Sequence, residues 1–252
     1  MGHWYKFVLY YLWIAPHALL AVVSVLMFVR RLHKTFPLFF AYTLYETLGF
    51  LARFAAYVIG PGLGTSYRYV FIATLVGSTA LRFGIIHEIV NNVFHDYPRL
   101  EPIATASVRW LTGLLLFAAI MSVFYSSGTL PDNVLVVVRL LGRSVAIIQA
   151  GLLLFLFLFS RMFGLSWRSF VFGIAFGFAI FASTELAKWT LELTALTDHS
   201  KDLLNLLPTG SYHVSVLVWL GYLLKAEKPA GAATYTAPEM DRWSGELERT
   251  PQ

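Results

Sequence analysis

The sequence predicts an all-α polytopic membrane protein, a bundle of seven transmembrane helices with the N-terminus outside and the C-terminus in the cytoplasm. The first observation is composition: the 252 residues are 58% hydrophobic and 13% charged, whereas soluble domains carry about 25% charged residues. The second is that the apolar residues gather in seven long runs. The third is that lysine and arginine concentrate in alternate connections between these runs, as they do beside cytoplasmic helix ends.

Each apolar run has roughly the length that crosses a bilayer, which is about 20 residues. The runs cover residues 7–29, 37–59, 68–92, 105–126, 134–160, 169–193 and 211–225. They fill most of residues 1–225, so we expect this part of the chain to be one transmembrane domain without a separate soluble domain. Residues 226–252 are polar and rich in proline, glycine and alanine, and we expect a flexible cytoplasmic tail there.

The distribution of positive charge predicts the orientation of the bundle. The first, third and fifth connections and the tail carry the basic residues Arg30, Arg31, Lys34, Arg99, Arg161, Arg168, Lys225 and Lys228. The other connections contain little besides Lys201. Because basic connections stay on the cytoplasmic side, the N-terminus is expected outside and the C-terminus inside.

Charged side chains lie well inside several of the apolar runs. They are Glu46, Arg53, Arg82, Arg139, Arg143, Glu185 and Lys188. An ionisable group near the bilayer centre costs roughly 2.5–3.5 kcal/mol on insertion scales, so it normally faces a partner or a polar cavity. Seven residues return a helix almost to the same face, which aligns Tyr42, Glu46 and Arg53. We therefore expect the charged stripes to converge inside the bundle.

Five of these groups are cations and two are anions, so internal pairing leaves a surplus of positive charge. Arginine suits forked contacts with carboxylate or phosphate. We therefore predict a buried cationic pocket, open to the outside, for an anionic small molecule or lipid headgroup, with Glu46 and Glu185 orienting the arginines. The alternative is a network of salt bridges that holds the helices in register.

The predicted function is a non-enzymatic binding or sensory protein of the membrane. Three alternatives stay open. One is a small secondary transporter that uses Glu46 or Glu88 as a proton-coupling carboxylate. Another is a membrane-embedded enzyme with His87 and Glu88 in acid–base roles, and the third is a structural subunit. Besides the bilayer and the anionic ligand, a cytoplasmic effector or a second copy of the chain is expected as a partner.

Residues 87–92 read His-Glu-Ile-Val-Asn-Asn. The pattern starts like a zinc hydrolase motif but lacks the second histidine four positions on, so we expect a polar cluster that caps a helix. The chain has no cysteine, which excludes thiolate ligands. We predict no metal and no cofactor. Nucleic acid is not an expected partner, because the basic residues form no contiguous face.

Gly173 and Gly177 form a GxxxG pattern, which permits close helix packing within the bundle or between protomers. The stretches RRLHKTFPLFFAYTLYETLGF and LLLFLFLFSRMFGLSWRSFVFGIAFGF resemble those of uncharacterised seven-span proteins of the bacterial inner membrane. The resemblance extends over most of the chain and implies the same location and the same number of spans. It implies no activity and no site residues.

Overall fold

The computed structural model describes residues 3–59, 64–94, 169–192 and 198–225, together with shorter stretches between residues 102 and 154. This described part is helical and contains no strand, which confirms the all-α class. Three helices include a segment long and apolar enough to cross a membrane: Tyr10–Val29, Tyr67–Phe94 and Phe170–Lys188. The chain is therefore a membrane protein. The predicted tail, residues 226–252, lies outside the described residues.

The structure contains five long helices and one short 3₁₀ turn within residues 3–94, 170–192 and 198–225. They are α1 (His3–Val29), η1 (Leu32–Lys34), α2 (Pro37–Ile59), α3 (Gly64–Phe94), α6 (Phe170–Glu192) and α7 (Asp198–Lys225). Four of the long helices match the predicted runs to within a few residues. The start of α7 was predicted wrongly, because the helix begins at Asp198 and not at residue 211. Polar residues in its first turns lower the hydropathy there without preventing helix formation, so an apolarity criterion misses them.

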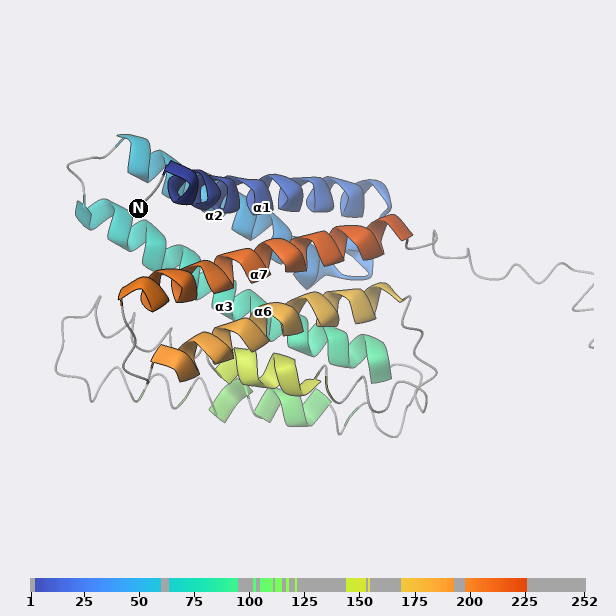
Figure 1. The fold of residues 1–252 in the computed structure, drawn as a ribbon. Coiled ribbons are helices and arrows are strands. Elements are labelled where there is room, and N and C mark those ends of the chain that lie inside the picture. The colour runs from blue at the N-terminus through green and yellow to red at the C-terminus, as the bar shows by residue number, and fades with distance from the viewer. Residues whose placement is uncertain are drawn as a thin grey trace, which may run out of the picture.

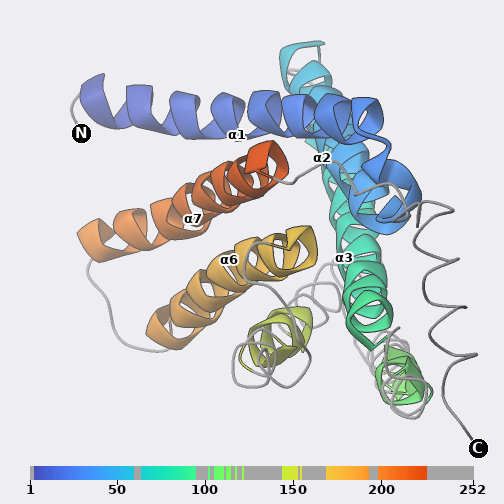
Figure 2. The ribbon, with the colours of Figure 1, turned by 90° about the vertical axis from the view of Figure 1, so that its right-hand side faces the viewer.

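The five helices form a ring around a shared interior. Helix α1 packs against α2 and α7, α2 packs against α3, and α7 packs against α6. The ring closes between α3 and α6, which share the smallest contact. Helices α1, α3 and α7 run in one direction and α2 and α6 in the other, so the first turns of α1, α3 and α7 lie at the same end as the last turns of α2 and α6 (Figure 1). The packed pair α1 and α7 is therefore parallel, and the other packed pairs are antiparallel. Viewed from the side, α7 lies between α1 and α6 (Figure 2).

Aromatic side chains fill the centre of the ring. Phe39 and Tyr42 of α2 face Phe178 of α6 and Trp219 of α7, and all four are buried. The ring centroids are 5.2 Å apart for Phe39 and Trp219, and 4.8 Å apart for Phe178 and Trp219. The first pair meets edge to face and the second is tilted. Favourable aromatic pairs at such distances add about 0.5–1.5 kcal/mol to the burial of the rings. This aromatic core holds α2, α6 and α7 together.

The glycines of the GxxxG pattern pack inside the bundle. A Cβ added at Gly177 would lie 2.2 Å from Nε1 of Trp219, and one added at Gly173 would lie 2.3 Å from the ring of Tyr222. The close approach permits two hydrogen bonds to the backbone of α6. Ser215 Oγ donates to the Gly177 carbonyl at 2.7 Å, and Trp219 Nε1 donates to the Ile174 carbonyl at 3.2 Å. The contact between α6 and α7 thus depends on the missing side chains.

We expect Gly177→Ala to lower the melting temperature of the purified protein by several degrees. The added methyl group must displace Trp219, and overpacking of this kind costs about 1–3 kcal/mol. The matched control is Gly221→Ala on α7, since no atom that the structure describes lies within 4 Å of a Cβ there. Thermal unfolding in detergent measures both variants, and an equal effect of the two substitutions would contradict the packing argument.

Candidate functional site

Two charged side chains of α2 form an ion pair along one face of the helix. Glu46 and Arg53 are two helical turns apart, and Arg53 Nη2 lies 3.7 Å from Glu46 Oε2. Helix α3 supplies a polar partner to each, because Ser78 hydrogen-bonds Glu46 and Arg53 Nη1 donates to Thr74 Oγ1 at 3.3 Å. Gly49 lies between the two charges, and a Cβ there would come within 3.1 Å of Thr74 Cγ2. The small residue therefore lets α3 approach this polar face.

Arg82 connects three segments of the chain. It follows Ser78 by one turn on α3, and its Nη2 donates to Oε2 of Glu185 on α6 at 3.0 Å. The same nitrogen donates to Oε1 of Gln149 at 2.8 Å. The guanidinium carbon lies 5.0 Å from the centre of the Phe181 ring, within the range of a cation–π interaction. Only 5% of Arg82 is exposed, so its charge is balanced by these partners rather than by bulk water.

Two tyrosines lie between the ion pairs. Tyr42 of α2 is buried one turn before Glu46, within electrostatic range of Glu46, Arg82 and Glu185. Tyr212 of α7 places its phenol against that of Tyr42. The two ion pairs therefore belong to one cluster, which we name the polar core. Its members are Tyr42, Glu46, Arg53, Thr74, Ser78, Arg82, Gln149, Glu185 and Tyr212.

Three buried polar atoms of the polar core have no hydrogen-bond partner within the described part of the chain. They are Arg82 Nε, Gln149 Nε2 and the hydroxyl oxygen of Tyr212. A buried polar group without a partner costs about 1–3 kcal/mol. All three groups can donate a hydrogen bond. An acceptor placed beside them, such as an oxygen atom of a ligand or a water molecule, would remove that cost.

The polar core brings together four of the predicted site residues. These are Glu46, Arg53, Arg82 and Glu185. Lys188 lies on α6 one turn beyond Glu185 and has interactions of its own. Arg139 and Arg143 lie outside the described residues. In the polar core, two guanidinium groups therefore face two carboxylates, and their charges balance. The predicted surplus of positive charge would have to come from Lys188, Arg139 and Arg143.

Reasoning from charge alone misses the neutral members of the polar core. Thr74, Ser78 and Arg82 recur at every fourth position of α3, and this helical spacing is a signal that could have found the first two. Gln149 is an amide inside an apolar run, which is a weaker signal of the same kind. Tyr212 gives no such signal, because tyrosines near helix ends are common at membrane interfaces.

Glu88 caps the start of α2. Its Oε1 accepts a hydrogen bond from the backbone N–H of Leu38 at 2.8 Å, and its Oε2 accepts one from that of Phe39 at 2.9 Å. Helix α2 begins at Pro37, so these are backbone donors of the first turn, which have no partner within their own helix. The negative charge also complements the positive end of the helix dipole. Glu88 is therefore a structural residue that joins α3 to α2.

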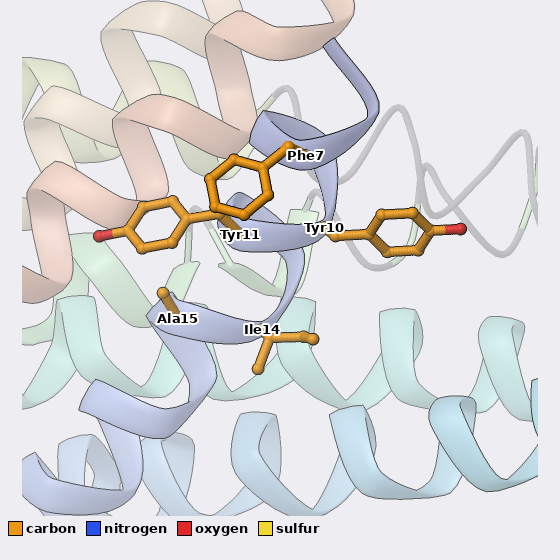
Figure 3. A pocket seen from close by; sticks show the side chains of 5 residues that line it. All are labelled: Phe7, Tyr10, Tyr11, Ile14 and Ala15. Carbon is orange, nitrogen blue, oxygen red and sulfur yellow. The ribbon is translucent and has the colours of Figure 1, made fainter. Parts of the chain in front are cut away.

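A surface groove on α1 is separate from the polar core. It has a volume of about 320 Å³ and is lined by apolar atoms of Phe7, Tyr10, Tyr11, Ile14 and Ala15 (Figure 3). Such a lining suits a hydrocarbon chain and not a charged group. Among the residues that the structure describes, no group of three or more histidine and carboxylate side chains could hold a metal ion.

No family model, curated protein or solved structure matches this chain. The resemblance to seven-span proteins of the bacterial inner membrane therefore stays a prediction.

We expect Glu88→Gln to loosen the first turn of α2. A glutamine keeps one acceptor oxygen but turns an N–H₂ group toward the second backbone donor, which leaves a buried N–H unpaired at about 1–3 kcal/mol. Hydrogen exchange measured by mass spectrometry should quicken at Leu38 and Phe39. Exchange in Phe170–Glu192 serves as the internal control and should not change. Unaltered protection at Leu38 and Phe39 would show that the cap contributes nothing.

Proposed function

We propose that this chain is a seven-span protein of the bacterial inner membrane, with the N-terminus outside and the C-terminus in the cytoplasm. In this proposal it is a binding or sensory protein, and an anionic small molecule or lipid headgroup binds in the polar core. The observation that supports it most is the pair of unpartnered donors, Arg82 Nε and Gln149 Nε2, beside an ion pair that fixes the guanidinium.

The two donors belong to side chains that already hold each other. Arg82 uses Nη2 for Glu185 and Gln149, which leaves the Nε edge of its guanidinium without a partner in the described part of the chain. The carbonyl of Gln149 is fixed by Arg82, so its amide nitrogen is held nearby. A carboxylate or phosphate offers several acceptor oxygens to such a pair. Its negative charge would be balanced by Lys188 and, if they enter the same interior, by Arg139 and Arg143.

The position of the polar core supports a sensory role. Arg82 and Glu185 meet where α3 and α6 close the ring, which is its smallest contact. A ligand bound there adds new contacts where α3 and α6 touch each other least directly among the helices that the structure describes. It therefore favours one separation of α3 and α6 over others, and a ligand shifts a conformational equilibrium only through such differential contacts. A cytoplasmic effector or a second copy of the chain would respond to the altered separation of α3 and α6.

A small secondary transporter is the second candidate. Here the supporting observation concerns the carboxylates: Glu88 is engaged as the cap of α2, whereas Glu46 lies inside the polar core beside Arg53. Glu46 is therefore the proton-coupling carboxylate in this alternative. Ligand-dependent proton movement in proteoliposomes would favour transport, and binding without flux would favour a sensor.

We expect anions with several oxygen atoms, such as phosphate or a dicarboxylate, to raise the melting temperature of the protein, and Gln149→Glu to abolish the shift. Glutamate keeps the acceptor for Arg82 but replaces the unpartnered donor with a second negative oxygen, which repels an anion. A ligand at 100 times its Kd stabilises the fold by about 2.7 kcal/mol. A thermal-shift series of anions and anionic lipids measures the effect in both proteins.

The matched control is Arg68→Lys, a change at an exposed position of α3 that should leave the anion-dependent shift intact. Free anions and lipid vesicles are tested separately, so the two sources of ligand are distinguished. If no anion or lipid changes the melting temperature of the unaltered protein, the charged residues form a salt-bridge network and the proposed function is wrong.

A further inference from the structure

Polar side chains also line the junction of α1 and α7, and one of them, Tyr212, belongs to the polar core as well. Tyr11 and His17 come from α1, and Tyr212 and His213 come from α7. The Tyr11 hydroxyl lies 3.4 Å from Nε2 of His213, and the ring centroids of His17 and Tyr212 are 5.8 Å apart. Arg53 of α2 lies within electrostatic range of His17.

The outer member of this series reaches the edge of the membrane-spanning segment. Tyr11 is 51% exposed and lies one residue after the start of that segment at Tyr10. Its ring points toward α7, whereas the ring of Tyr10 points away from it (Figure 3). The other ring nitrogen of His213, Nδ1, is buried and has no hydrogen-bond partner in the described part of the chain. His213 thus presents one nitrogen to the surface and one to the interior.

The inner members lead to the polar core. His17 Nδ1 lies 2.9 Å from the carbonyl of Trp13, so this nitrogen carries the proton and Nε2 keeps a free lone pair. The His17 ring stacks on Phe50 at 4.4 Å, which fixes its orientation. Tyr212 continues the series, because its phenol lies against that of Tyr42, within electrostatic range of Glu46.

We infer that these side chains form a proton path from the end of the bundle expected outside to the carboxylate of Glu46. The path runs from Tyr11 and His213, past His17 and Tyr212, to Tyr42 and then Glu46, with water molecules bridging the gaps. The inference extends the second candidate function, and its test does not require an anion to be bound. The inferred path admits protons from one side of the membrane and ends at Glu46. It does not continue to the other side, so it would not let protons leak across the membrane.

Proton transfer along the path changes the protonation state of Glu46 alone. Each phenol accepts a proton on its free lone pair and releases its own proton to the next acceptor. His17 accepts a proton on Nε2 and releases the same proton from Nε2, because its Nδ1 proton stays with the carbonyl of Trp13. The net protonation of these groups therefore does not change. The proton that leaves Tyr42 forms an O–H bond on Glu46, which becomes a neutral carboxylic acid. Arg53 of α2, Ser78 and Arg82 of α3, and Tyr212 of α7 face this carboxyl group. Arg53 faces His17 as well.

Proton transfer along this path would change the net charge of the polar core. Protonation of Glu46 removes the counter-ion of Arg53, which lies 3.7 Å from it. The polar core then gains one net positive charge, and an anion binds more readily to a site with that charge. A proton and an anion would therefore enter the polar core together.

The experiment is infrared difference spectroscopy on the full chain in lipid nanodiscs after a jump from neutral to acid pH. The C=O band of a protonated carboxyl group should appear, and it should be missing in Glu46→Gln, which assigns it. In Tyr212→Phe the band should rise more slowly by at least about tenfold, because a positioned proton carrier accelerates transfer by 10² or more. Tyr10→Phe, an exposed tyrosine beside the path, is the matched control and should behave like the unaltered protein.

Two results would overturn the proton path: no band that depends on Glu46, or an unaltered rate in Tyr212→Phe. His17→Phe provides a second variant in case Tyr212→Phe does not fold, and it should slow the band as well. The anion-dependent thermal shift distinguishes the two proposals, since His17→Phe, a change outside the polar core, should retain it. Loss of the shift with a normal band would refute anion binding and leave the proton path intact.

Discussion

The buried guanidinium of Arg82 requires acceptors from other helices, because an uncompensated charge in an apolar interior costs several kcal/mol. Glu185 of α6 and Gln149 meet this requirement within hydrogen-bonding distance. The contact is made where α3 and α6 touch each other least directly among the described helices, and the stretch that contains Val145 and Gln149 packs against α3 beside it. The guanidinium thus links three segments of the chain. The position of α6 relative to α3 therefore depends on groups that a bound anion or a proton can influence.

Hydrogen bonds between elements stabilise the end of the bundle that contains the start of α2. At the end that contains the start of α2, Glu88 caps that helix, and Arg30 donates a hydrogen bond to the carbonyl of Leu223 near the end of α7. The aromatic core lies between this end and the polar core. Buried atoms without a partner in the described part of the chain occur beside this end, at His33 Nδ1, and farther along the bundle in Arg82, Gln149, Tyr212 and His213.

Hydropathy predicted α1, α2, α3 and α6 to within a few residues, because a helix that crosses a bilayer needs a run of about 20 apolar residues. It missed the first turns of α7, where a helix continues through polar residues. The pairing of Glu46 with Arg53 was also predictable, since both lie on one helix at a fixed spacing. The contacts of Arg82 with Glu185 and Gln149, and of Glu88 with the start of α2, join segments far apart in the sequence. Helix periodicity predicts on which face of its helix a residue lies, but not which residue of another helix lies opposite it. These contacts could therefore not be predicted from the sequence.

Both candidate functions use the same polar core, and they differ in which end of the bundle must open. A transporter has to expose the core alternately to both sides. To open the end that contains the start of α2, it would have to separate the rings of Phe39, Phe178 and Trp219 and break the cap that Glu88 provides. A sensor needs only a change in the contact between α3 and α6, which is the smallest direct contact between neighbouring long helices in the described part of the chain. The distribution of packing therefore favours binding with a local conformational response, with the junction of α1 and α7 as the route of access.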